Sequence, residues 1–497
     1  MSDTRSKIAT GAAWMVGLKL LERFLGLLST VILARLLVPA DFGLVAMAMS
    51  IIAILDLLGS FGIDMMLIQK QDAKRELYDT AWTITALYGC VAAVVLCLLA
   101  APGAAFYSDP RLEEIMYVLA IATAVQGFDN IGVVAFRKEL AMDREFRFML
   151  GKKLITVTAT IVAAWLMKSY WALVIGTVIG RILAMALSYA VHPYRPRFSL
   201  VGVREIYRFS GWLVLNNNLL FVVGRVSDFI TGKVAGTHAM GIFTIANEIA
   251  SLPTTELVAP INRAAFPGYA RMADKPGELA ASYADIFGMI AVIVLPASIG
   301  IALLAEQCVL LILGWRWTDA VEPMRWLAIA GALAALQTNG LYVHIAMGRP
   351  AVVTVLASIH ACILIPGVLF GAQHSGVTGT AMAITGSALV MAPFYHGSVA
   401  RALGLPYRNL AARLWRPMAA SGLMALVVSG VAGMLSKPAT NAGIVFDIIV
   451  LASIGAVTYV AGVLALWRLA GTPPSAERYL LDRASALMVK FMDRRTC

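Results

Sequence analysis

Charged residues are scarce in this chain of 497 residues. Asp, Glu, Lys and Arg make up 14% of it, whereas a soluble domain averages about 25%. The deficit extends over the whole length, which excludes a soluble domain of ordinary size. Hydrophobic residues make up 60% of the chain, and apolar runs of roughly 20 residues, long enough to cross the core of a bilayer, recur from end to end. The composition therefore predicts an all-α integral membrane protein.

Motifs of common enzyme chemistry are also lacking. The five cysteines form no CxxC pair, the six histidines form no HExxH, and no GxxxxGK[ST] phosphate-binding loop occurs. We therefore expect no catalytic residue, no metal and no cofactor, and we predict that the protein is not an enzyme. Any energy input has to come from an ion gradient or from consumption of the product.

The apolar runs indicate about fourteen transmembrane helices. They lie near residues 9–37, 42–62, 78–101, 115–134, 148–167, 171–191, 207–230, 241–258, 282–305, 326–346, 351–372, 377–399, 411–434 and 444–469. The eighth run is interrupted by Pro253 and Pro260. After Pro473 and Pro474 we expect an amphipathic helix that lies on the inner membrane surface.

The positions of Lys and Arg predict the orientation. With the N-terminus inside, 29 of the 40 Lys and Arg residues fall in inside segments or the adjoining ends of the spans, and 7 fall in or next to outside segments, as the positive-inside rule requires. Both termini are therefore predicted to be cytoplasmic. The net charge of +11 is mainly a topology signal. No basic segment is long enough for a nucleic-acid-binding domain, so we expect no nucleic-acid partner.

The sequence contains a candidate internal repeat. A shift of 198 residues aligns features of the first and seventh spans: Trp14 with Trp212, Gly26 with Gly224, Arg35 with Lys233 and Gly43 with Gly241. Both copies begin inside, which suits two lobes related by an axis along the membrane normal with a cavity between them. We predict an N-terminal lobe at residues 1–200 and a C-terminal lobe at 201–400, each of six helices. Spans 13 and 14 follow at 401–470, and the cytoplasmic amphipathic helix at 471–497.

The first span carries three charges on one helix face. Lys19, Glu22 and Arg23 are spaced i, i+3 and i+4, and a charge inside the membrane has to be compensated or functional. One interpretation is a self-contained pair between Lys19 and Glu22. The other is a polar stripe along a wet cavity, in which one cation remains available for an anion.

The sixth and seventh spans carry further charges. Arg225 and Asp228 are three residues apart, and Asn217 and Asn218 lie earlier in the same run. A simple salt bridge between Arg225 and Asp228 is one interpretation. Arg181 has no acidic residue on its own helix, so it needs a partner or a ligand.

Acidic residues also fall within predicted spans. They are Asp56, Asp129 and Glu248. Each can pair with one of the arginines, for example Asp129 with Arg181. The alternative is a site for a proton or a sodium ion.

Two short segments resemble a known family. Leu36–Gly43, which reads Leu-Leu-Val-Pro-Ala-Asp-Phe-Gly, resembles the L-x-P-x-D-F-G turn of the bacterial polysaccharide transporter family. Phe136–Leu140 followed by Phe146–Phe148 resembles an inner loop of that family. The family belongs to the multidrug, oligosaccharidyl-lipid and polysaccharide exporter superfamily, and the likeness extends over the chain in span number and topology.

This resemblance implies a lipid-linked oligosaccharide flippase in the bacterial inner membrane. Such a protein moves undecaprenyl-diphosphate-linked oligosaccharide repeat units to the outer leaflet for exopolysaccharide, capsule or O-antigen synthesis. Its implied partners are that lipid, membrane lipids, a coupling proton or sodium ion and the polysaccharide polymerase machinery. The two extra spans are similar to those of the peptidoglycan-precursor flippase, where they help form a groove for the lipid tail.

The residues fit this hypothesis. Arginine binds phosphate bidentately, and amides can contact sugar hydroxyls. On charge and position alone, the candidate cavity residues are Lys19, Glu22, Arg23, Asp129, Arg181, Asn217, Asn218, Arg225, Asp228 and Glu248.

Three other functions are open to such a chain. A drug or cation antiporter of the same superfamily usually has twelve spans and an acidic cavity. A polysaccharide polymerase or ligase usually has a large outside loop, which this sequence lacks. A non-transporting scaffold would leave the intramembrane charges without a purpose.

Overall fold

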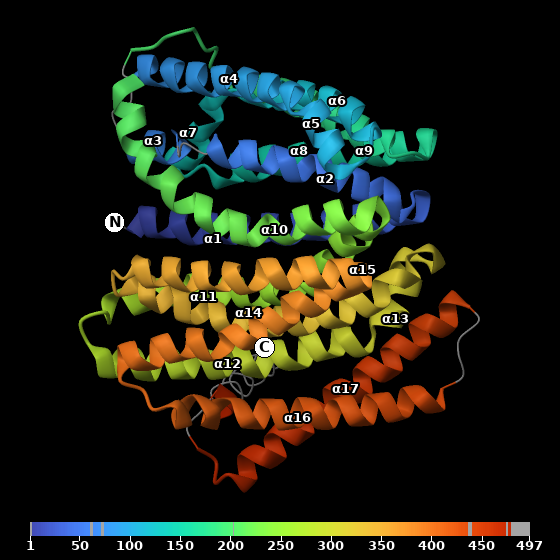
Figure 1. Ribbon diagram of the computed structural model, residues 1–497. Helices are drawn as coiled ribbons and strands as arrows, with labels where there is room; N and C mark the ends of the chain where they lie inside the picture. The colour runs from blue at the N-terminus through green and yellow to red at the C-terminus, as the bar shows by residue number, and fades with distance from the viewer. Residues whose placement is uncertain are drawn as a thin grey trace, which may run out of the picture. The chain divides into compact units, whose positions relative to one another are not determined.

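The computed structural model describes the backbone of residues 2–59, 63–70, 74–201, 203–435, 440–473 and 476–478. Within these ranges, the side chains of 2–9, 12, 65, 69 and 204–223 are not described. The described backbone is helical and contains no β-strand (Figure 1). Nine described helices are long and apolar enough to cross a membrane, or ten if one bent pair forms a single span. The fold class of a polytopic helical membrane protein is confirmed. The exact number of fourteen spans and the orientation of the termini stay predictions.

The chain divides into two compact units, Met1–Gly241 and Ile242–Cys497. In the seventh predicted span, 207–230, side chains are described from residue 224 onwards. These residues belong to the first unit. The lobe boundary near residue 200 stays a prediction, and so do the boundaries of the C-terminal spans.

The first unit consists of helices that run from the N-terminus into the first part of α10. They are α1 (Ser2–Leu36), α2 (Pro39–Leu58), α3 (Ile63–Gln69), α4 (Arg75–Leu98), α5 (Ala100–Tyr107), α6 (Arg111–Gly127), the short helix η1 (Ile131–Val133), α7 (Val134–Lys138), α8 (Met142–Met167), α9 (Trp171–Val191) and α10 (Val203–Ala250). The motif Leu36–Gly43 forms the turn between α1 and α2. Pro39 occupies the first turn of α2, where its missing N–H is not needed. The Asp41 carboxylate accepts a hydrogen bond from the Val38 N–H at 3.1 Å, which satisfies one of the free donors at the helix start.

A break in α10 separates the seventh and eighth predicted spans. Gly236 has a φ of 82°, a left-handed conformation that glycine adopts without steric cost. The second part of α10 continues through the π-helix η2 (Pro253–Val258) into α11 (Ala259–Arg271). Proline removes a backbone donor, so the irregular turn begins at Pro253, which the sequence marked as an interruption.

The second unit holds the remaining helices. They are α12 (Pro276–Leu303), α13 (Ala305–Cys308), η3 (Val309–Leu313), η4 (Trp315–Ala320), α14 (Val321–Ala346), α15 (Pro350–Leu403), α16 (Tyr407–Met434) and α17 (Asn441–Leu469). Non-helical residues Ser375 and Gly376 interrupt α15, between the predicted spans 351–372 and 377–399. The predicted C-terminal amphipathic helix at 471–497 lies largely outside the described residues.

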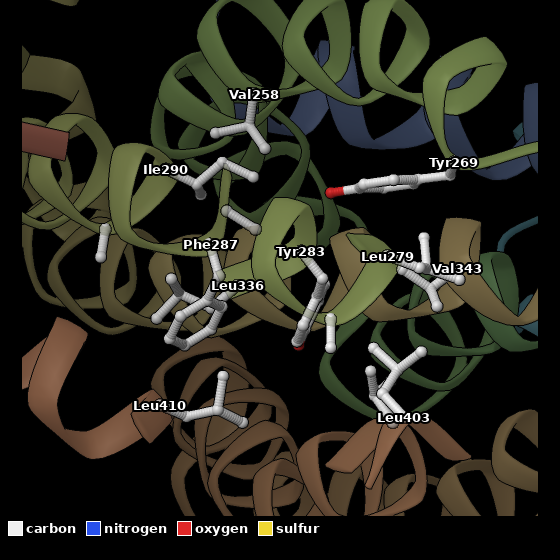
Figure 2. Packing of buried hydrophobic residues seen from close by; sticks show 14 of the residues in the cluster. Val258, Tyr269, Leu279, Tyr283, Phe287, Ile290, Leu336, Val343, Leu403 and Leu410 are labelled. Atoms are coloured by element: carbon white, nitrogen blue, oxygen red, sulfur yellow. The ribbon is translucent and has the colours of Figure 1, made fainter. Parts of the chain in front are cut away.

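A buried cluster forms the core of the second unit. Tyr283 and Phe287 of α12 lie at its centre and are 0% and 1% exposed. Figure 2 shows them among Tyr269 of α11, Leu336 of α14 and Leu410 of α16. The Tyr269 hydroxyl donates to Asn339 Oδ1 at 2.9 Å. Four helices are therefore held together by one apolar core, in which a buried polar group is satisfied within the protein.

Candidate functional site

The charged face of α1 lies along α8. The Trp14 and Phe146 rings are 4.9 Å apart, and Gly26 faces Lys153, whose Nζ is 3.7 Å from the place where a Cβ of Gly26 would lie. Lys19 Nζ donates to Glu22 Oε2 at 3.1 Å, so the predicted pair within α1 forms. Lys19 remains 65% exposed. The absence of a side chain at Gly26 therefore brings a cation of α8 next to the charged face of α1.

The fourth predicted span is broken at its C-terminal end. The helix α6 ends at Gly127, and its axis and that of the following helical segment differ by 55°. Asn130 stabilises the break, since its side chain accepts the Gly132 N–H at 2.9 Å and its own N–H donates to Ser188 Oγ at 3.0 Å. Irregular backbone at membrane depth is tolerated where it is buried in protein or lines a polar cavity.

This break places Asp129 beside α8. Lys152 Nζ donates to Asp129 Oδ2 at 2.8 Å, and both side chains are about one-third exposed. The sequence had suggested Arg181 as the partner of Asp129, but the structure pairs Asp129 with Lys152. Spacing along a helix identifies the face that a charge occupies, but it does not identify which other helix packs against that face.

Two glycines bring α9 close to α8. Cβ atoms added at Gly176 and Gly180 would lie 2.6 Å from Thr160 Cα and 3.0 Å from Thr156. Such contacts between small residues let membrane helices approach closely. Arg181 follows Gly180 directly, so its position is set by this close packing. Asp56 of α2 lies within electrostatic range of Arg181, so Asp56 supplies part of the compensation that Arg181 needs.

These charged residues lie on helices that pack against one another in pairs, α1 on α8, α8 on α9, and α2 and α6 on α9. We define them together as the basic site. Its cations are Lys19, Arg23, Lys152, Lys153 and Arg181, and its carboxylates are Glu22, Asp56 and Asp129. Five cations against three carboxylates leave a net charge of +2 at neutral pH. Within the first unit, a cluster of Lys and Arg with this excess can bind a diphosphate through charge-assisted hydrogen bonds.

The other predicted site residues make none of the contacts described above for the basic site. Arg225 and Asp228 form the predicted salt bridge, at 3.0 Å between Nη1 and Oδ2. Glu248 belongs to the second unit. The side chains of Asn217 and Asn218 lie outside the described residues.

Sequence reasoning missed Lys152 and Lys153. Both were counted with the inside charges, although they fall within the predicted span 148–167. The helix α8 begins at Met142, so both lysines lie within it. The signal that could have identified them is the sequence Lys152-Lys153-x-x-Thr156-x-x-x-Thr160, which continues as a polar stripe into the apolar helix.

The segment after α9 is fixed to α4 and to the α6 break. The Tyr194 hydroxyl donates to Asp79 Oδ1, and the Arg197 N–H donates to the same oxygen at 3.0 Å. Asn130 Nδ2 donates to the carbonyls of His192 and Tyr194 at 3.3 and 3.0 Å. The segment between the sixth and seventh spans is therefore a docked part of the first unit.

The chain is similar to several polysaccharide proteins. A family described as "Polysaccharide biosynthesis protein" matches residues 32–322. The lipopolysaccharide biosynthesis protein WzxC of Escherichia coli is 24% identical over 442 residues, covering 87% of this chain and 89% of that protein. The succinoglycan biosynthesis transport protein ExoT of Rhizobium meliloti is 24% identical over 458 residues, covering 92% and 91%.

Solved structures show the same architecture. The lipid II flippase MurJ in an inward closed conformation aligns with a TM-score of 0.74 at 11% identity, over 92% of this chain and 99% of that one. An inward-facing multidrug resistance MATE family transporter of the MOP superfamily aligns with a TM-score of 0.59 at 15% identity, over 77% and 94%. At such low identity the likeness shows the fold alone. From these matches and its apolar helices, this multi-pass membrane protein belongs to the polysaccharide biosynthesis protein family and has the fold of MOP-superfamily transporters.

Proposed function

We propose that this protein is a flippase of the bacterial inner membrane. It moves undecaprenyl-diphosphate-linked oligosaccharide repeat units from the inner to the outer leaflet, for exopolysaccharide, capsule or O-antigen synthesis. It is a transporter rather than an enzyme. The observation that carries this proposal is the basic site, because its excess of two positive charges within a helical unit suits an anionic headgroup better than a cationic drug.

The geometry of the basic site supports recognition of a diphosphate. Lys153 and Arg181 come from adjacent helices, α8 and α9, which the contacts of Gly176 and Gly180 hold close together. Two cations from two helices can bind two phosphates at once, and the planar guanidinium of Arg181 can bind one of them bidentately. The carboxylates Asp56 and Asp129 moderate the charge, so the diphosphate is held and can also be released.

The second unit offers a surface for the lipid tail. A groove of about 460 Å³ lies between α12, α16 and α17, and its lining is apolar and includes Pro296, Met424, Gly455 and Val460. A prenyl chain gains free energy from burial against such a surface by dispersion and shape fit. This groove uses the two C-terminal spans that a twelve-span transporter lacks.

Transport by alternating access needs a contact that closes the outer end and then opens. The start of α2 and the second part of α10 provide such a contact within the first unit, where Gly43 and Gly241 bring the two backbones together. Both segments lie at the outer end in the predicted topology. With this contact closed, the headgroup enters from the inside while the tail stays in the lipid.

The test is the leaflet in which the lipid-linked oligosaccharide accumulates when the gene is deleted. Inner-membrane vesicles of known sidedness are treated with an impermeant probe that reacts with the glycan. We expect complete repeat units on the cytoplasmic face, restored to the outer face by the wild type and not by Arg181→Gln. Unpolymerised repeats on the outer face would instead indicate a polymerase or ligase. An unchanged distribution would contradict the flippase and favour the drug or cation antiporter.

A further inference from the structure

A short segment near the C-terminus is docked against α12 and α16. The chain turns at Gly471, which has a φ of 80°, and Trp467 Nε1 donates to the Pro473 carbonyl oxygen at 3.1 Å. Ala476 and Glu477 follow and are 5% and 4% exposed. The chain therefore turns back after α17 and packs against the second unit, on the cytoplasmic side in the predicted topology.

Gly288 of α12 brings this segment together with α16. A Cβ added at Gly288 would lie 3.6 Å from Arg413 Cβ and 3.7 Å from Ala476 Cβ. One turn farther along α16, Arg416 Nε donates to Glu477 Oε1 at 2.8 Å, and Arg416 Nη2 donates to Glu477 Oε2 at 3.4 Å. The carboxylate thus accepts two parallel hydrogen bonds from the guanidinium, which is the geometry in which arginine also binds a phosphate.

Arg413 supplies a second guanidinium on the same face of α16. It precedes Arg416 by three residues, so the two side chains are neighbours on the helix surface. Arg413 Nη1 lies 2.8 Å from Asp285 Oδ1, but the Asp285 side chain is 61% exposed, so water weakens this pair. The charges of Arg413, Arg416 and Asp285 sum to +1. The arrangement therefore suits an anion with two or more oxygen atoms, and the Glu477 carboxylate takes that place.

Stability alone gives little reason to bury this ion pair. The cost of removing both charges from water offsets most of their attraction, and well-packed apolar residues are often as stable in the same place. Loss of one partner, in contrast, leaves a buried charge that another anion can neutralise. A carboxylate on a terminal segment is therefore suited to exchange with an external anion at Arg416.

The two arginines lie next to the apolar groove between α12, α16 and α17. Tyr459 of α17 lines that groove and lies within electrostatic range of Glu477. Met424 also lines the groove, and it follows Arg416 by eight residues of α16, about 12 Å along the helix axis. A lipid with its chain in the groove can therefore place a phosphate at Arg416. Basic pockets between membrane helices bind lipid headgroups on the cytoplasmic side.

We propose that Arg413 and Arg416 bind the phosphate of a membrane lipid whose chain lies in this groove, and that Glu477 competes for the same site from within the protein. Two lipids share this chemistry, an anionic phospholipid of the inner leaflet and the undecaprenyl-diphosphate carrier. The second lipid rests on the proposed flippase function, whereas the phosphate site itself does not. Without lipid, Glu477 neutralises Arg416. Lipid binding releases the segment that carries Glu477.

Hydrogen exchange of the wild-type, full-length protein in a neutral detergent gives a local readout. Mass spectrometry follows the peptide that contains Glu477 while phosphatidylglycerol, diacylglycerol, undecaprenyl diphosphate or undecaprenol is added. We expect a phosphate-bearing lipid to increase the exchange with saturation, and its uncharged counterpart to leave the exchange unchanged. A response to phosphatidylglycerol alone identifies the phospholipid as the ligand, and a response to undecaprenyl diphosphate alone identifies the carrier. Because this peptide reports only on its own site, a failure of the flippase assay leaves the result interpretable.

Three variants distinguish a binding site from a structural ion pair. Glu477→Gln should bind the responding lipid about tenfold more tightly than the wild type, because the competitor no longer reduces the fraction of open sites. The double variant Arg416→Gln/Glu477→Gln should lose this gain. The matched control Glu278→Gln, in an exposed ion pair with Lys275, should behave as the wild type does.

Two results would overturn the proposal. One is exchange of the wild-type peptide that neither phosphate-bearing lipid changes. The other is equal lipid affinity of Glu477→Gln and the wild type. If Glu477→Gln does not fold, the exchange of the wild type decides the outcome.

Discussion

Gly43 and Gly241 lie back to back in the first unit. A Cβ added at Gly43 would lie 2.7 Å from the Gly241 nitrogen and 1.7 Å from the Thr237 carbonyl oxygen, and a Cβ added at Gly241 would lie 1.8 Å from the Pro39 carbonyl oxygen. The two glycines are counterparts under the 198-residue shift. Gly43 and Gly241 therefore occupy equivalent positions in the two copies of the candidate repeat and contact each other. Only glycine fits at this contact.

We expect Gly43→Ala to separate α2 from α10 and to destabilise the protein. Overpacking against fixed backbone costs about 1–3 kcal/mol or more, which should lower the melting temperature in detergent by several degrees. Gly224→Ala in α10 is the matched control, because its Cβ would meet nothing within 4 Å. Equal melting temperatures for the two variants would contradict the close contact.

The ion pair between Lys152 and Asp129 positions a cation of the basic site. We expect Asp129→Asn to lower the stability by roughly 1–2 kcal/mol, since the pair is only partly buried. The same change should strengthen the binding of undecaprenyl diphosphate, because it raises the net charge of the site by one. Isothermal unfolding and ligand titration measure the two effects separately. A variant that loses stability and also binds the lipid more weakly would argue against a basic binding site.

A buried ion pair anchors the start of the C-terminal segment. Arg416 Nε donates to Glu477 Oε1 at 2.8 Å, and the two side chains are 5% and 3% exposed. Glu477→Gln leaves the Arg416 charge buried and should cost about 3–5 kcal/mol. The exposed pair between Lys275 and Glu278 is a control, so Glu278→Gln should change the stability by less than about 1 kcal/mol. Thermal unfolding of the purified variants measures both, and similar losses would show that the buried pair has no special role.

The loop residue His192 should make stability depend on pH. Burial lowers the pKa of His192 below its usual 6.5, and the positive charges of Arg195 and Arg144 lower it further against the opposing effect of Glu139. The folded state therefore favours the neutral ring. The neutral His192 ring contributes to the free energy of unfolding. This contribution is fully present above pH 6.5 and is lost as the pH falls through the lower pKa that His192 has in the folded state. We expect the melting temperature to fall over that range.

The variant His192→Gln isolates this contribution. It should flatten the pH dependence below pH 6.5, whereas substitution of the exposed His374 should not. A pH dependence that is unchanged in His192→Gln would show that other groups cause it.

Much of the fold could be predicted from the sequence, because bilayer thickness fixes the length of an apolar helix. The break between the spans at 351–372 and 377–399 appears at Ser375 and Gly376, and the family indicated by Leu36–Gly43 is confirmed. The candidate site could be predicted only in part. Local pairs such as Lys19 with Glu22 follow from spacing along one helix.

Contacts between different helices could not be predicted from the spacing of residues along one helix. The pair of Lys152 with Asp129 depends on where α6 breaks and on how α8 and α9 pack.

The most direct test of the central claim is lipid binding to the basic site. Purified full-length protein is titrated with undecaprenyl diphosphate and, separately, with undecaprenol, which has the same tail and no charge. We predict that the wild type binds the diphosphate at least about tenfold more tightly, a difference of about 1.4 kcal/mol. The double variant Lys153→Gln/Arg181→Gln should lose this preference. The control Lys233→Gln, in α10 beside Ser108 and Phe106, should keep it. Equal affinity of the wild type for both lipids, or an undiminished preference in the double variant, would contradict the account.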